Sequence, residues 1–132
     1  MGFLYTLLGI AGAFIALMIG MRLYIQFRSS ALKGKAAPTL NGKAGQLIRK
    51  GKPALFYFYS PACGACKAMT PVVTGMSKTR ENVFTVDISK DMETARKFGV
   101  MATPTLVTVK NSIVSNILIG PQSPATIENQ LS

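Results

Sequence analysis

The first 27 residues are dominated by an uncharged apolar run from Gly2 to Met21. At about 1.5 Å per residue, a helix of this run would measure roughly 30 Å, which matches the hydrocarbon core of a bilayer. Cleaved signal peptides begin with basic residues and end at a small-residue cleavage site. Here no Lys or Arg precedes Arg22, and the nearest Ala-rich stretch, at residues 36–37, lies well beyond the run. The pattern predicts a retained transmembrane anchor over residues 1–27.

Small residues recur along one side of this anchor. Gly12, Ala16 and Gly20 are spaced four residues apart, and Gly9 with Ala13 forms a neighbouring pair. Such a stripe lets two membrane helices approach closely, although Gly and Ala are also common in membrane helices that do not pair. The ordinary interpretation is favoured, and a weak homodimer through the anchor is the alternative.

The pattern changes twice after the anchor. Residues 28–41 mix Ser, Gly, Lys and Pro without a sustained apolar period, which predicts a basic linker with at most a short lead-in strand. From residue 42 the periods of helices and strands alternate. The expected elements are a helix over 44–51, a strand over 53–59, a helix over 66–79, a strand over 83–88, a helix over 91–99, strands over 104–110 and 112–119, and a helix over 123–131. This order predicts one α/β domain over residues 42–132, a mixed sheet flanked by helices.

Within that domain, the apolar run PALFYFY reads as a central strand covered on both faces. Pro71 is expected to kink the helix that follows. Lys110 and Asn111 are expected to separate the last two strands as the turn of an antiparallel hairpin. Asp91 and Ser123 are placed to begin the last two helices.

The only two cysteines, Cys63 and Cys66, lie in YSPACGACKAMTP, between the apolar strand and the next helix. Three functions compete for such a pair: a dithiol that exchanges disulfides, half of a metal site, or a structural staple. A structural zinc site needs about four ligands, and the chain has two cysteines and no histidine. A staple gains least when it closes the shortest loop. Redox exchange is therefore favoured, and no metal or cofactor is predicted.

The spacing also suggests the role of each thiol. Helix positions three apart lie on one face, so the pair can close a disulfide with little backbone movement. Cys63 is expected at a helix N-terminus, where unpaired amides favour the thiolate, and is interpreted as the nucleophile. Cys66, one turn further on and more covered, is interpreted as the resolving thiol. Gly64 and Ala65 leave the first turn slim, so that a substrate chain can approach.

The net charge of +10 is unevenly distributed along the chain. The bases between residues 22 and 52, with no acid among them, are Arg22, Arg28, Lys33, Lys35, Lys43, Arg49, Lys50 and Lys52. The excess therefore follows the anchor, where it can meet anionic lipid headgroups, and the rest of the domain is nearly balanced. This distribution disfavours nucleic-acid binding and makes membrane lipid the expected partner of the basic segment.

The stretch from about residue 44 to 132 resembles the thioredoxin family. FYFYSPACGACKAMTP is similar to the family's active-site strand, Cys-x-x-Cys motif and helix, with Pro71 at the family's helix proline. VDISKD and KFGVMATPTLVTVKN resemble the second half of the fold, including Asp87 and Gly99, and Gly120 matches a late glycine. The resemblance implies a thioredoxin-like fold and a cis bond before Pro104. It also implies a groove for an extended protein substrate beside the dithiol, formed by Ala62, Gly64, Ala65, Thr103 and Pro104.

Three positions depart from the family pattern. The usual buried aspartate six residues before the first cysteine is Tyr57, the usual tryptophan is Ala62, and Val83 stands in the region of the family's lysine. In the family, the buried aspartate is thought to help deprotonate the resolving cysteine. A tyrosine is a poor base for this task near neutral pH. We interpret Tyr57 as an aromatic side chain packed in the strand. The departures suggest slower exchange, a restricted set of partners, or a reduction potential unlike that of cytosolic thioredoxin.

Together these observations predict a membrane-anchored thiol:disulfide oxidoreductase that exchanges disulfides with protein thiols and serves in electron transport. The alternative is a redox-idle scaffold that binds a membrane protein through the same groove. Because short segments rich in Lys and Arg tend to stay inside, the domain is expected on the cytoplasmic face of a bacterial membrane. The periplasmic face is the alternative, since disulfides persist there. The sequence does not name the substrate or the electron donor.

Overall fold

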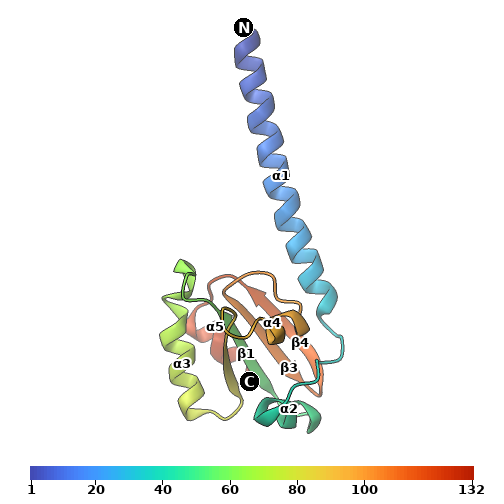
Figure 1. Cartoon of the computed structure of the whole chain (residues 1–132), viewed down its shortest axis with the longest axis vertical. Coiled ribbons are helices and arrows are strands. Elements are labelled where there is room, and N and C mark those ends of the chain that lie inside the picture. Colours follow the sequence, from blue (N-terminus) through green and yellow to red (C-terminus); the bar gives the residue numbers. More distant parts are fainter. The chain divides into compact units, whose positions relative to one another are not determined.

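The computed structural model describes the backbone of residues 1–132 and every side chain except those of residues 29 and 30. The chain forms two compact units, Met1–Ala31 and Leu32–Ser132. The first unit is made by helix α1, which runs from Gly2 to Leu32 (Figure 1). Over Gly2–Arg28 this helix is long and apolar enough to cross a membrane, by length and composition. Its large apolar side chains, such as Phe3 and Phe14, are exposed, so other residues of the chain do not cover them.

The second unit begins earlier than residue 42, where the sequence places the start of the domain. The N–H of Gly34 donates to the carbonyl of Val114 at 2.8 Å, and Ala36 forms an isolated antiparallel bridge with Ile113. Leu40 is buried in the core at 7% exposure. Residues 34–37, expected as part of the linker, therefore lie along the edge of the domain's sheet, and Leu40 packs in its core.

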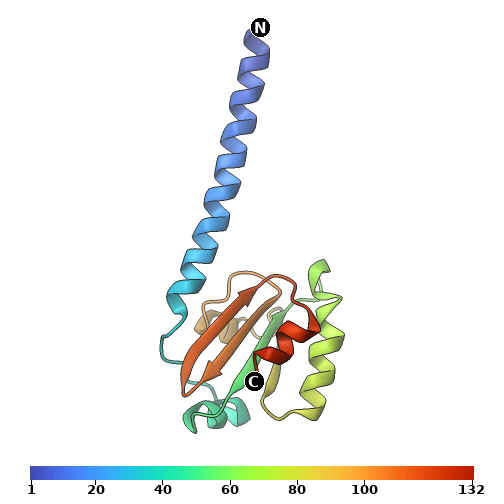
Figure 2. The same ribbon diagram turned by 180° about the vertical axis from the view of Figure 1, so that it is seen from behind.

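The sheet has four strands in the order β2-β1-β3-β4 (Figures 1 and 2). Strand β1, Ala54–Tyr59, pairs in parallel with β2, Val83–Asp87, and antiparallel with β3, Thr105–Lys110. Strand β4, Ile113–Ile119, extends the sheet beyond β3 as an antiparallel hairpin. The central position of β1 explains its continuous apolar sequence, because both of its faces are covered.

The helices cover both faces of this sheet. They are α2 (Gly42–Arg49), the three-residue 3-10 helix η1 (Gly64–Cys66), α3 (Met69–Thr79), α4 (Met92–Lys97) and α5 (Pro124–Asn129). Side chains of α2 and α4 pack in one core cluster, and side chains of α3 and α5 pack in the other. The predicted order of helices and strands, and the α/β class, are confirmed.

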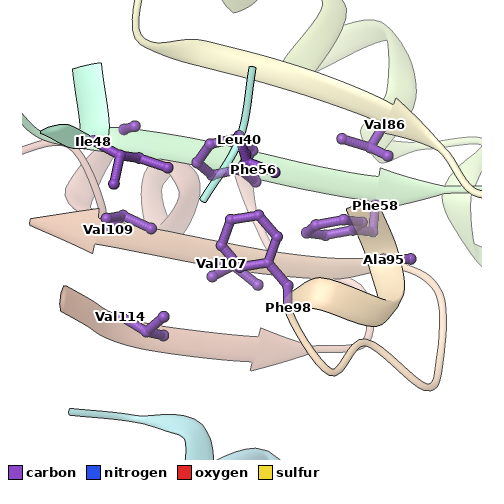
Figure 3. Packing of buried hydrophobic residues seen from close by; sticks show 11 residues of the cluster. Leu40, Ile48, Phe56, Phe58, Val86, Ala95, Phe98, Val107, Val109 and Val114 are labelled. Carbon is purple, nitrogen blue, oxygen red and sulfur yellow. The ribbon is translucent and has the colours of Figure 1, made fainter. Parts of the chain in front are cut away.

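Successive residues of β1 point into the two different core clusters. Phe56 and Phe58 face α2 and α4, where the ring of Phe98 lies 4.8 Å and 5.6 Å from theirs, between centroids (Figure 3). Leu55 and Tyr57 face the other cluster. All four side chains are at most 1% exposed. This packing fixes β1, and Phe98 fixes the start of the segment that leads from α4 to β3.

Local signals define the ends of the later elements. The carboxylate of Asp91 accepts from the N–H of Thr94, and the Thr94 hydrogen bonds lower the pKa of Asp91. The hydroxyl of Ser123 caps α5 with Pro124 in its first turn.

The turn between β3 and β4 lies at Asn111 and Ser112, one residue later than expected. Both have positive φ, the conformation of a tight hairpin turn whose twist matches the strands.

Candidate active site

The loop after β1 brings Cys63 to the carboxyl end of the central strand. Ser60 organises this loop, because its side-chain oxygen accepts from the N–H of Ala62 at 3.2 Å. Its carbonyl accepts from the N–H of Cys63 at 3.1 Å. Open α/β sheets place their chemistry at this edge.

The two cysteines form a disulfide, with their Cα atoms 5.4 Å apart. Their environments differ: Cys63 is partly exposed, whereas Cys66 is 2% exposed. A thiol-disulfide exchange requires a nucleophile that an incoming sulfur can reach, and only Cys63 of this pair meets that requirement. The structure therefore brings the two predicted catalytic residues together with unequal access.

The turn that holds the pair differs from the expected α-helix. Cys63 precedes η1, in which the N–H of Cys66 donates to the carbonyl of Cys63 and the N–H of Lys67 donates to that of Gly64, both at 3.3 Å. Helix α3 begins only at Met69. Pro71 has no N–H to donate to the carbonyl of Lys67 four residues earlier, which agrees with the interruption. The expectation that an α-helix starts at Cys66 was wrong by three residues.

Two hydroxyl groups reach the backbone of Cys66 at this interruption. The Thr70 hydroxyl donates to the Cys66 carbonyl at 2.9 Å. The Tyr57 hydroxyl lies 3.0 Å from the Thr70 oxygen and 3.4 Å from the Cys66 carbonyl. Burial raises the pKa of Tyr57, against the opposing effect of the Thr70 hydrogen bond. The phenol is therefore neutral at physiological pH, and its pKa is even further from that of a useful base than in water.

The Thr103–Pro104 peptide lies at the same edge of the sheet as the dithiol loop. Thr105 pairs with Phe58, so the residues just before Thr105 lie beside the end of β1. The bond is cis, the isomer that the resemblance implies. Pro104 is buried, and its carbonyl accepts from the N–H of Gly120 at 2.9 Å. Thr103 is partly exposed.

A surface hollow of about 360 Å³ opens beside the cysteines. It is lined by Tyr59, Ser60, Pro61, Cys63, Cys66, Lys67, Thr70, Pro71 and Asp87. The side chain of Ser89 donates a hydrogen bond that lowers the pKa of Asp87, so the rim carries a carboxylate near neutral pH. Ala62, Gly64 and Ala65 are exposed next to Cys63. Nothing bulky on these three residues blocks the approach of a partner.

A metal site is one of the alternative functions considered for the cysteine pair. Among the side chains that the structure describes, no group of three or more His, Cys, Asp or Glu residues is placed to hold a metal ion.

Thr70 and Ser60 are two residues of this site that were not predicted from the sequence. Thr70 stands four residues after Cys66, a spacing that brings side chain and carbonyl together on a helical turn.

Comparisons with known proteins agree with this geometry. A thioredoxin family model matches residues 40–132. A thioredoxin of Alicyclobacillus acidocaldarius is 33% identical over 90 residues, which cover 66% of this chain and 86% of that protein. A thioredoxin of Mycobacterium tuberculosis is 32% identical over 92 residues, covering 67% and 79%. The crystal structure of Schistosoma mansoni thioredoxin superposes with a TM-score of 0.56 at 31% identity, covering 69% of this chain and 86% of that one.

A mixed sheet that carries a Cys-x-x-Cys disulfide at the end of its central strand defines a thiol:disulfide oxidoreductase fold and site. The chain belongs to the thioredoxin family, and it is a thiol:disulfide oxidoreductase of that family.

Proposed function

We propose that this protein is a membrane-anchored oxidoreductase that exchanges disulfides with protein substrates through Cys63 and Cys66. The observation that carries the proposal is the unequal access of the pair, with Cys63 partly exposed and Cys66 2% exposed. The relatives are thioredoxins, which supports protein disulfides as the substrate class. The apolar helix over Gly2–Arg28 supports the anchor.

The exchange proceeds in two displacements. The Cys63 thiolate attacks one sulfur of the substrate disulfide, which forms a mixed disulfide and expels the other substrate sulfur as a thiolate. The Cys66 thiol then loses its proton to solvent and attacks the sulfur of Cys63. The Cys63–Cys66 disulfide forms as the second substrate thiolate leaves. Two electrons pass from the dithiol to the substrate, whose two thiolates take up protons from water.

The exposed residues around Cys63 form the docking surface in this proposal. Ala62, Gly64 and Ala65 admit the substrate chain, and the backbone of Thr103 before Pro104 aligns it as an extended segment. The hollow beside Cys63 accepts a neighbouring substrate side chain. A dithiol of a donor protein then reduces the Cys63–Cys66 disulfide, so the chain transfers electrons between two protein partners.

The proposal places the domain on the cytoplasmic face of a bacterial membrane. Arg22, Arg28, Lys33 and Lys35 follow the uncharged run Gly2–Met21, within the distance over which such charges set orientation. In that compartment the pair is kept mostly reduced, which suits a reductase. The same bases can contact anionic lipid headgroups.

Trapping in bacterial cells tests this function. In the full chain with Cys66→Ser, attack by Cys63 still occurs but the second displacement is lost, so membrane fractions should contain mixed disulfides between Cys63 and protein partners. The matched control Cys63→Ser should retain few or none. In intact cells a membrane-impermeant maleimide should not label Ser132→Cys, placed in a chain with both native cysteines replaced by serine, until the cells are lysed.

Two results would contradict the proposal. Equal trapping by the two variants would remove the roles assigned to the cysteines. Strong labelling by the impermeant maleimide in intact cells would place the domain outside the membrane. This result would contradict the inward orientation and also the reductase direction, which was proposed from that orientation.

A further inference from the structure

The Tyr57 hydroxyl is a buried polar group that the exchange steps do not use. The side chain is 0% exposed and packs in the cluster that contains Leu55, Met69 and Val73. A buried hydroxyl must find a hydrogen-bond partner, or its desolvation destabilises the fold. Its neighbours are the Thr70 hydroxyl and the Cys66 carbonyl.

The direction of these hydrogen bonds follows from the donors available. The Thr70 hydroxyl has one proton, which it donates to the Cys66 carbonyl at 2.9 Å. The Tyr57 hydroxyl must then donate, either to the Thr70 oxygen at 3.0 Å or to the Cys66 carbonyl at 3.4 Å. In both cases the chain of bonds runs from strand β1 to the backbone of the resolving cysteine.

This connection lies where the regular helix is interrupted. Because α3 begins at Met69, the Cys66 carbonyl precedes the ordered ladder of that helix, and side-chain hydroxyls hold it. On the other side of Cys66, its N–H is held by the Cys63 carbonyl at 3.3 Å in a short 3-10 turn. A turn of this kind has poorer hydrogen-bond geometry than an α-helix. The hydroxyls therefore link the Cys66 backbone to the central strand.

We propose that Tyr57 and Thr70 are positioning residues for the second displacement, in which they hold the Cys66 backbone so that its sulfur stays within reach of the Cys63 mixed disulfide. When the Cys63–Cys66 bond is absent, no covalent link constrains the two sulfurs, and the hydrogen bonds take over that task. The resolving step depends on this proximity, whereas attack by Cys63 on an incoming disulfide does not. The inference rests on the proposed function and concerns the step that completes it.

A coloured aromatic disulfide, dithiobis(nitrobenzoic acid), separates the two steps in the full chain in detergent. Attack by Cys63 on this probe releases one nitrothiobenzoate, and attack by Cys66 on the mixed disulfide releases the second, so stopped-flow absorbance follows both. In Tyr57→Phe and in Thr70→Val, the first release should keep its rate. The second should slow about fivefold, the effect of losing one hydrogen bond. The double variant should slow the second release by less than the product of the two single effects, because both act through one network.

The control is Thr108→Val, which removes a buried hydroxyl that donates to Gln130 elsewhere in the domain. This variant should lower the free energy of unfolding in urea about as much as Tyr57→Phe and Thr70→Val do. It should leave the rates of both releases unchanged. The positioning role would be wrong if Tyr57→Phe slowed both releases equally. It would also be wrong if Tyr57→Phe slowed the second release no more than Thr108→Val does. A wild-type chain that releases no coloured thiolate would instead overturn the proposed exchange function, so the two failures are distinguishable.

Discussion

Replacement of Cys63 by serine in the full chain should lower the rate of insulin-disulfide reduction by on the order of a thousandfold or more, the scale expected when an enzyme loses its nucleophile. Cys66 cannot substitute for Cys63, because its side chain is covered and only 2% of it is exposed. A serine hydroxyl stays protonated near neutral pH and is not a redox group. The measurement is the turbidity of the freed insulin chains with dithiothreitol as the donor, corrected for the reaction without protein.

The exposed neighbour supplies the control for this loss. Ala68→Ser places the same hydroxyl five residues further on, at an exposed position just before α3 and without removing a thiol. Its rate should remain within about threefold of wild type, since an exposed substitution of this size perturbs the turn little. A Cys63→Ser variant that keeps more than a tenth of the wild-type rate would show that another group attacks the substrate.

Replacement of Phe56 by alanine should lower the free energy of unfolding by about 3–5 kcal/mol, the usual cost of removing a buried phenylalanine ring. Phe56 is 1% exposed and contacts two rings, with centroids 4.8 Å from Phe98 and 5.2 Å from Phe84. It lies in the middle of β1, paired with both neighbouring strands. The loss is a large part of the stability of an ordinary domain, about 5–15 kcal/mol.

Urea unfolding of the full chain in detergent, followed by the circular dichroism of the domain, measures this loss. Met92→Ala removes an apolar side chain that is 46% exposed and should change stability by less than about 1 kcal/mol. If Phe56→Ala cost no more than Met92→Ala, the packing of β1 against α4 would not be what holds the domain together.

The sheet and the position of the dithiol were predictable because their signals are local and strong. PALFYFY is too short and too apolar for a surface element, and it forms the central strand with Leu55 and Phe56 on opposite faces. The helix ends follow from single side chains, as at Asp91 and Ser123. A strand that ends just before Cys63 then places the pair at the sheet edge.

Three features were not predictable from such local signals. The start of the compact unit at Leu32 depends on pairing between residues 34–37 and the edge of β4, distant in sequence. The residue at which α3 begins depends on the hydrogen bonds of the folded turn, although Pro71 indicates that the helix is disturbed nearby. Tyr57 was correctly interpreted as a packed aromatic side chain, but the partners of its hydroxyl come from a helix that only the folded chain brings near.

Cys63 and Cys66 act as a reversible redox pair in the proposed function, and not as a permanent structural disulfide. The most direct test of this role is an equilibrium redox titration of the full chain in detergent, in glutathione and dithiothreitol buffers of stepped potential, read by alkylation and intact mass. We expect one reversible two-electron transition, with a midpoint between about −270 and −120 mV, the range of known Cys-x-x-Cys oxidoreductases. A disulfide that stays closed in buffers poised below about −300 mV, where structural disulfides resist reduction, would contradict it.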